Sequence, residues 1–194
     1  IVYLAIKLGL AVRYRPASGD PSRVGTVAAV VPFYNEDPAT LAACLESILG
    51  QSRPVERIYV IDDGSTTDAA LRVAHRVLSA SGHPGVVIHR LAENRGKRHA
   101  QAWAFRRLDT DLVLTVDSDT ILHPHALHEA ARGFEDPAVQ GVTGNVQAHN
   151  AGTNLLTRLT SRVAAQLRRD GALDLLHARA HRRPGGVPVG HRGP

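Results

Sequence analysis

The sequence predicts an α/β fold, namely an open, mostly parallel β-sheet with helices on both faces. Short apolar segments suited to strands alternate with longer segments whose apolar residues recur every three or four positions. The first of these segments, residues 24–33, is a continuous apolar run, which is typical of a strand buried on both faces. Strands that alternate with helices favour parallel pairing, because a helix carries the chain back to the start of the next strand.

The elements follow from this alternation and from local stop and start signals. Asp37 is suited to cap a helix with Pro38 at its first position, and Gly50 lies at its far end. Strands are expected at 24–33, 55–61, 85–91, 112–116 and 139–146, and the remaining helices at 67–79, 97–108 and 124–134.

Four regions are expected along the chain. Residues 1–12 are apolar except for Lys7, and composition leaves open an amphipathic start or the stump of a membrane helix, since a full span needs about 20 residues. A polar, turn-rich linker at 13–23 precedes the α/β domain at 24–161. Residues 162–194 form an aberrant basic tail, for which we favour a frameshift over a natural extension. Because the chain starts at Ile1 and contains no methionine, we expect an internal fragment of a longer protein.

The basic net charge does not indicate a nucleic-acid-binding protein. The formal charge is +5, yet residues 1–161 hold 16 basic and 16 acidic side chains, and residues 162–194 hold 7 basic and 2 acidic ones. A protein that binds nucleic acid needs its basic surface on the folded body. We therefore expect no nucleic-acid partner.

The single cysteine is predicted to lie in the core. Cys44 shares one apolar helix face with Leu41, Leu45, Ile48 and Leu49. One cysteine also excludes an intramolecular disulfide. A buried thiol on such a face is a poor candidate for a nucleophile.

Polar clusters follow four of the predicted strands, where ligands bind in open α/β sheets. Asp117 and Asp119 follow an apolar strand and are separated from each other by one residue. Together they can hold a hard divalent ion, which would neutralise a diphosphate. Asp62 and Asp63 follow another strand; they are read either as an acidic turn that caps the next helix or as acceptors for a uracil N–H and ribose hydroxyls. Tyr34 is read either as a base-stacking residue or as an aromatic side chain at a strand end.

Glycine and two cations open the helix predicted at 97–108. Gly96 precedes Lys97 and Arg98, an arrangement that suits an anionic diphosphate at a helix N-terminus. Taken alone, the same stretch also fits a solvated basic turn. The spacing of a Walker phosphate-binding loop is missing.

The motifs, in order and spacing, resemble those of family 2 glycosyltransferases with the GT-A fold, a Rossmann-like fold. They are Val-Pro-Phe-Tyr-Asn-Glu-Asp at 31–37, Asp-Asp-Gly-Ser at 62–65, Gly-Lys-Arg at 96–98 and Asp-Ser-Asp-Thr at 117–120. Within that family, longer stretches at 96–105 and 153–160 resemble hyaluronan synthases more than chitin or cellulose synthases. The resemblance covers residues 1–161.

The resemblance implies inverting transfer from a UDP-sugar, UDP-N-acetylglucosamine or UDP-glucuronate, to a growing polysaccharide, aided by Mg²⁺ or Mn²⁺. It assigns donor binding to Tyr34, Glu36, Asp62, Asp63, Lys97, Arg98 and Asp117, and metal binding to Asp117 and Asp119. It also implies that residues 1–12 are the stump of a membrane helix, with the domain on the cytoplasmic side of the cell membrane in the intact protein.

The family's general base and later motifs are not found beyond Thr160, so the fold is expected to be incomplete at its C-terminal side and the chain to bind donor without catalysing transfer. The alternatives are a non-catalytic nucleotide-sugar-binding module and a chitin or cellulose synthase-like transferase.

Overall fold

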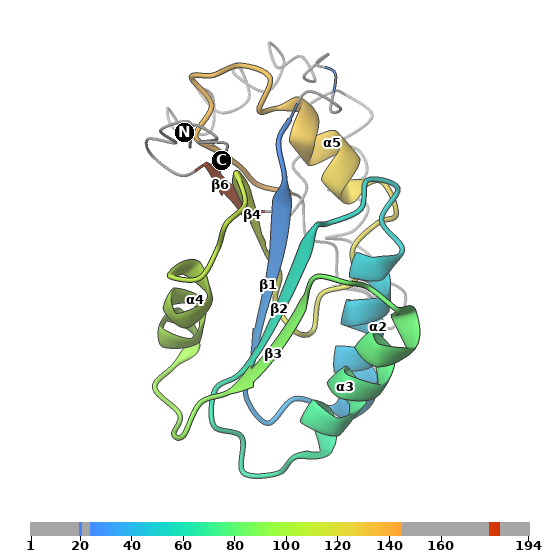
Figure 1. Ribbon diagram of the computed structural model, residues 1–194, viewed down its shortest axis with the longest axis vertical. Helices are drawn as coiled ribbons and strands as arrows, with labels where there is room; N and C mark the ends of the chain where they lie inside the picture. Colours follow the sequence, from blue (N-terminus) through green and yellow to red (C-terminus); the bar gives the residue numbers. More distant parts are fainter. Residues whose placement is uncertain (1–19, 21–23, 145–178, 183–194) are drawn as a thin grey trace, which may run out of the picture.

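The computed structural model describes Asp20, residues 24–144 and the backbone of residues 179–182. Its centre is a six-stranded sheet in the order β3-β2-β1-β4-β6-β5 (Figure 1). The strands are β1 (Val27–Phe33), β2 (Arg57–Asp62), β3 (Val86–Arg90), β4 (Leu112–Thr115), β5 (Gly141–Val142) and β6 (Arg179–Arg182). The helices are α2 (Pro38–Leu49), α3 (Ala69–Ser81), α4 (Lys97–Phe105) and α5 (Ala126–Arg132).

Four neighbouring strands are parallel. β1 lies between β2 and β4 and pairs in parallel with both, and β2 pairs in parallel with β3. All seven residues of β1 are buried, as the continuous apolar run predicts. β6 is antiparallel to β4 and to β5. The predicted open, mostly parallel α/β sheet is therefore confirmed.

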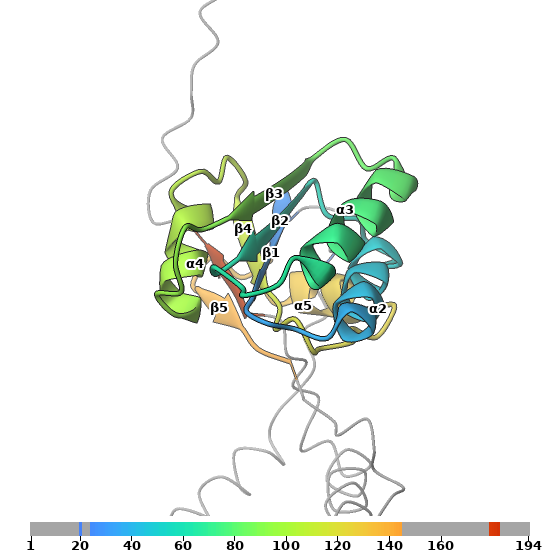
Figure 2. The same cartoon turned by 90° about the horizontal axis from the view of Figure 1, so that it is seen from below.

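The two faces of β1 belong to two separate cores. Val27, Ala29 and Val31 pack in a cluster with apolar side chains of α2, α3 and α5. Ala28 and Val30 point to the opposite face, where their cluster includes alanines of α4. Figure 2 shows α4 on one side of the sheet and α2, α3 and α5 on the other. Helices on both faces are thus confirmed.

The predicted capping of α2 is present. The Asp37 carboxylate accepts a hydrogen bond from the Thr40 N–H at 2.8 Å, Pro38 opens the helix, and Gly50 follows its last residue. Cys44 is completely buried on the inner face of α2, as its periodicity predicts. The helix start therefore has a purely local cause, the side chain at position 37.

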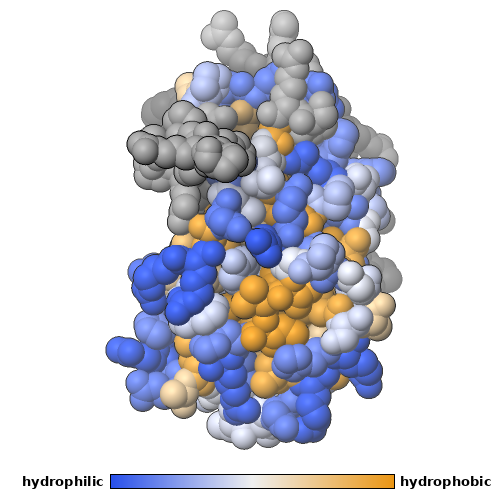
Figure 3. All heavy atoms as spheres, in the orientation of Figure 1, coloured by the Kyte–Doolittle hydropathy of each residue, from blue (hydrophilic) through white to orange (hydrophobic). Residues whose placement is uncertain are grey.

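β3 is one of the two edge strands of the described sheet, and its side chains are less buried than those of β1. Val86, Val87 and Ile88 are half-buried, and Figure 3 shows an apolar patch over this edge. Val86 and Ile88 pack in the cluster that includes α3, and Val87 packs in the cluster that includes α4. The two helices therefore lie on opposite sides of β3 (Figure 2).

The C-terminal end of the sheet differs from the sequence-based expectation. The strand expected at 139–146 is only the two residues of β5, and the last two residues of that range lie outside the described part of the chain. Glycine at position 141 gives no side chain to pack, which weakens strand formation. β6 was not predicted, because Arg-Ala-His-Arg lacks the alternating apolar pattern of a strand.

Several expectations concern residues whose placement is not described. The apolar run at 1–12, all but one residue of the 13–23 linker, residues 145–161 and most of the 162–194 tail lie outside the described part of the chain. Within the described part, no helix combines the length and the apolar character needed to cross a membrane.

Candidate functional site

One cavity lies at the carboxyl ends of β1, β2 and β4, beside the first residue of α4. Its volume is about 250 Å³. Its lining consists of Pro32, Phe33, Tyr34, Glu36, Asp63, Lys97, Asp117, Ser118 and Asp119. Four loops that are far apart in the sequence therefore supply one cavity at the sheet edge where ligands bind in open α/β folds.

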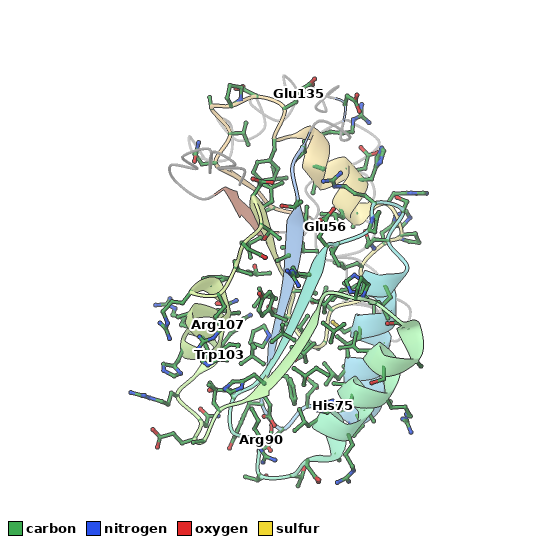
Figure 4. All side chains as sticks on the ribbon, in the orientation of Figure 1. Glu56, His75, Arg90, Trp103, Arg107 and Glu135 are labelled. Atoms are coloured by element: carbon green, nitrogen blue, oxygen red, sulfur yellow. The ribbon has the colours of Figure 1, made fainter. Side chains whose placement is uncertain are left out.

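A larger hollow between α3 and β3 lacks comparable chemistry. It measures about 420 Å³, and its lining is His75, Leu78, Ser79, Gly82, His83, Val86 and Ile88. His75, which Figure 4 shows on α3, is one of these lining residues. No carboxylate, lysine or arginine lines it, so its size alone does not make it the better candidate for a charged ligand.

Asp117 and Asp119 both face the cavity. They flank the buried Ser118 in a turn after β4, in which the Thr120 N–H donates to the Asp117 carbonyl at 3.0 Å. Both aspartates are exposed, so their carboxylates are accessible to an ion. Within the described residues, no group of three or more metal-binding side chains converges. Two carboxylates are nevertheless enough for Mg²⁺ when substrate phosphates complete its coordination.

Glu36 connects the loop after β1 with this turn. One of its carboxylate oxygens accepts the Ser118 hydroxyl at 2.5 Å, and the other accepts the Asp37 N–H at 3.0 Å. The carboxylate therefore holds the Asp-Ser-Asp turn by its middle residue while it lines the cavity.

Cys44 lies beneath the same turn. Its thiol donates to the Asp117 carbonyl across 3.4 Å. Burial raises the pKa of the Cys44 thiol to about 12, and the nearby carboxylates of Asp119, Glu36 and Asp117 add to this effect. The thiol is therefore a protonated donor, in agreement with the prediction of a buried core residue.

Asp62 and Asp63 have different surroundings despite their adjacency. Asp62 is fully buried; it accepts the Ser65 N–H at 2.8 Å, and its other oxygen lies 3.3 Å from Arg90 Nε. Arg90, at the lower end of β3 in Figure 4, also donates to the Ser65 carbonyl. Asp62 does not line the cavity, whereas Asp63 does.

Asp63 anchors the loop that leads into α4. Its two oxygens accept the Gly96 N–H at 2.7 Å and the Arg95 N–H at 3.2 Å. Gly64, with φ +73°, allows this approach, since a Cβ there would lie 2.5 Å from the Glu93 carbonyl carbon. The anchored loop places Lys97, the first residue of α4, at the cavity.

Lys97 and Arg98 differ in position. The Lys97 ammonium forms an ion pair with the Asp117 carboxylate and lines the cavity. Arg98 is exposed and lies outside the cavity lining. The structure therefore brings together Tyr34, Glu36, Asp63, Lys97, Asp117 and Asp119, and leaves Asp62 and Arg98 outside the lining.

Two contributors to this site were not identified from the sequence. Ser118 holds Glu36 in place, and a buried serine in an acidic turn gives no distinctive signal. Asn35 has a positive φ of 48° between Tyr34 and Glu36. Its residue type was a usable signal, because asparagine is enriched in the left-handed region.

Known proteins with similar sequences are glycosyltransferases. Hyaluronan synthase from Streptococcus pyogenes serotype M3 (strain ATCC BAA-595 / MGAS315) is 48% identical over 162 residues, which cover 82% of this chain and 38% of that protein. An N-acetylglucosaminyltransferase from Rhizobium sp. (strain N33) is 43% identical over 135 residues, covering 69% of this chain and 30% of that protein. The chain thus spans less than two fifths of the length of these curated relatives.

Solved structures share the fold at low sequence identity. A mannosyltransferase from Pyrobaculum calidifontis, PcManGT in complex with GDP-Man and Mn²⁺, superimposes with a TM-score of 0.69 at 20% identity, over 94% of this chain and 53% of that one. S. aureus TarS 1–349 in complex with UDP-GlcNAc gives 0.55 at 22% identity, over 67% and 36%. These structures support the GT-A-like architecture expected from the sequence.

The family itself follows from a profile match over most of the chain. The description of that family is glycosyl transferase family 2, and the match covers residues 28–190. The matched region contains every residue that lines the cavity. The chain belongs to glycosyl transferase family 2.

Proposed function

We propose that this chain forms the donor-binding part of a hyaluronan synthase-like glycosyltransferase that uses a UDP-sugar. The observation that carries the proposal is that one cavity is lined by Tyr34, Asp63, Lys97, Asp117 and Asp119. It combines an aromatic ring, hydrogen-bond acceptors, a cation and a pair of carboxylates, which together match the parts of a nucleoside diphosphate. The similarity to an N-acetylglucosaminyltransferase supports UDP-N-acetylglucosamine as a donor. UDP-glucuronate is proposed as the second donor from the resemblance to hyaluronan synthases.

The uridine is assigned to the side of the cavity formed by the loops after β1 and β2. Tyr34 is 45% exposed at the cavity, so its ring is available to stack on a base. Asp63 is only 2% exposed, and its two oxygens already accept the Gly96 and Arg95 N–H groups. The remaining lone pairs of this carboxylate, which lines the cavity, are assigned to the uracil N–H or to ribose hydroxyls. Asp62 is fully buried and contacts Ser65 and Arg90. It is therefore assigned the role of fixing the loop that carries Asp63, and not of contacting the ligand.

The diphosphate is assigned to the opposite side. Asp117 and Asp119 would hold Mg²⁺ or Mn²⁺, which neutralises the departing diphosphate when bound. Lys97 supplies a further positive charge at the cavity. Arg98 is assigned a weaker, longer-range contribution, because it is exposed outside the lining.

In the proposed reaction, an acceptor hydroxyl attacks the anomeric carbon of the donor and the bond to UDP breaks, with inversion. This chain's residues bind the donor and stabilise the charge on the leaving group. A general base is not assigned to any described residue. The polysaccharide acceptor, the membrane attachment and the cytoplasmic orientation of the domain are proposed for a protein as long as its curated relatives.

Calorimetric titration of the purified 194-residue chain with UDP, with and without Mn²⁺, tests the proposal. We expect binding that requires the metal and that is lost in Asp119→Ala. Glu135→Ala is the matched control, because this exposed residue lies at the opposite end of the molecule (Figure 4). If the folded chain shows no binding of UDP at millimolar concentration with Mn²⁺ present, donor binding by this domain is refuted.

A further inference from the structure

We infer that Asn35 is a positioning residue of the donor site, acting through Tyr34. This inference rests on the proposed donor-binding function. Asn35 does not line the cavity, but the residues on either side of it, Tyr34 and Glu36, both do. Its influence on a ligand must therefore pass through its neighbours.

The backbone at Asn35 is in a conformation that few residue types adopt. Its φ of 48° is the only positive value of a non-glycine residue in the part of the chain that the structure describes. Most L-residues are strained there, whereas asparagine tolerates it because its short side chain makes local hydrogen bonds. Strained backbone of this kind concentrates at functional sites.

Asn35 is held in this conformation by the loop after β2. Its side-chain oxygen accepts the Thr66 N–H at 2.8 Å and the Thr66 hydroxyl at 2.9 Å. Its own N–H donates to the Ser65 hydroxyl at 2.9 Å. Three hydrogen bonds from one residue therefore tie the loop after β1 to the loop after β2.

The loop that receives these bonds is itself fixed. The Ser65 N–H donates to the buried Asp62 carboxylate, and the Ser65 carbonyl accepts from Arg90. Arg90 also lies against Asp62, at 3.3 Å. Asn35 is thus connected to a hydrogen-bonded anchor at the ends of β2 and β3.

Tyr34 depends on this anchor more than Glu36 does. Glu36 has its own contacts, to Ser118 and to the Asp37 N–H. For Tyr34, no side-chain hydrogen bond or ring contact is found among the described residues, and 45% of it is exposed. The backbone turn at Asn35 is therefore what sets the place of the Tyr34 ring at the cavity.

The test is a double-mutant cycle on UDP affinity in the presence of Mn²⁺, using the full 194-residue chain. Asn35→Ala loses both Thr66 contacts and is strained at positive φ, so we expect affinity to fall about ten-fold, equivalent to about 1.4 kcal/mol. Asn35→Gly keeps the backbone conformation without strain, so its loss should be smaller. In a Tyr34→Ala background, Asn35→Ala should change the affinity less than about two-fold, because the residue it positions is gone.

Thr66→Val, which removes one of the contacts, should weaken UDP binding slightly, and the neighbouring exposed Thr67→Ala should leave it unchanged. Circular dichroism and thermal midpoints establish that each variant is folded. An equal loss in the wild-type and Tyr34→Ala backgrounds, or no loss in either, would overturn the role of Asn35 while leaving donor binding intact. Failure of the wild-type chain itself to bind UDP would instead remove the donor site and this inference with it.

Discussion

The Lys97 ammonium and the Asp117 carboxylate form an ion pair, although one opens α4 and the other follows β4. Their side chains are 50% and 58% exposed. Asp117 is also one of the two carboxylates assigned to the metal. Lys97 and a divalent cation therefore compete for the same oxygen atoms, while a bound diphosphate would attract both.

This competition predicts opposite effects of one substitution. Lys97→Met should raise the affinity for Mn²⁺ alone by up to about five-fold, since an exposed ion pair is worth about 0.2–1 kcal/mol. The same variant should weaken UDP binding in saturating Mn²⁺, because a positive charge at the diphosphate is lost. Electron paramagnetic resonance of free Mn²⁺ and calorimetry measure the two affinities.

Arg98→Met is the matched control for that experiment, since it removes one positive charge from the same helical turn outside the cavity lining. It should change Mn²⁺ affinity less than Lys97→Met does. Equal effects of the two variants would mean that general charge, and not the contact with Asp117, governs metal affinity.

Substitutions at Gly64 and Gly82 distinguish two costs of adding a side chain, namely a steric clash with a neighbouring loop and backbone strain at positive φ. Both have positive φ, +73° and +65°, but a Cβ at Gly64 would meet backbone atoms of Glu93 and Asn94, and one at Gly82 would meet nothing within 4 Å. Gly82→Ala should cost about 1–2 kcal/mol of unfolding free energy from strain. Gly64→Ala should cost at least about 1 kcal/mol more and also weaken UDP binding. Urea denaturation compares them, and equal losses would argue against the steric contact.

Much of the fold could be predicted from the sequence, because short local patterns determine where several strands and helices begin and end. The apolar run of β1 predicted a fully buried strand, and Asp37 with Pro38 predicted the start of α2 to the residue. β6 could not be predicted, because its four residues carry no strand pattern and are placed by pairing with β4 and β5. Backbone pairing with distant strands does not require an alternating apolar pattern, so the sequence of a short polar segment does not indicate it.

Six of the predicted site residues line one cavity, but the sequence could not show which of them would do so. The acidic pairs after β2 and β4 lie at one edge of the sheet, as expected from the sequence, because the carboxyl ends of parallel strands meet there. Both Asp62 and Asp63 are buried, and only Asp63 lines the cavity. Sequence alone could not separate them, because their roles depend on which carboxylate faces Arg90 and which faces the loop before α4.

The cap of α2 should become weaker in acid. The backbone N–H of Thr40 and its hydroxyl hold the pKa of Asp37 below its ordinary value of 3.8. A lowered pKa in the folded state means that the stabilisation is present above pH 3.8 and is lost as the pH falls through the folded pKa. Asp37→Asn keeps a capping side chain that does not titrate.

The stability difference between wild type and Asp37→Asn, from thermal unfolding, should therefore be constant near neutral pH and shift against the wild type below pH 3.8. Comparing differences between the two proteins cancels the titration of the other carboxylates. A difference that does not change with pH would show that the Asp37 charge contributes nothing to the cap.

Cys44 should be unreactive in the folded chain. Its thiol is fully buried and its pKa is raised to about 12, so almost no thiolate exists at pH 8. A disulfide reagent such as DTNB should react rapidly in urea and very slowly without it. The stabilisation linked to the protonated thiol is present below pH 9.0 and is lost as the pH rises from there towards 12. Rapid labelling of the native chain would place Cys44 at the surface.

The position of β1 between β2 and β4 sets the dimensions of the cavity. Asp63 follows β2 and Asp117 follows β4, so two strand spacings, about 10 Å in all, separate the backbones that carry them. Hydrogen bonds from the Asp63 N–H to the Phe33 carbonyl and from the Val116 N–H to the Val30 carbonyl extend the pairing to the strand ends. A ligand held at both sides must therefore be elongated. Substitutions in the loop after β2 or in the loop after β4 can change which ligand group is recognised by that loop. They do not change the distance between the two loops, which the strand spacing determines.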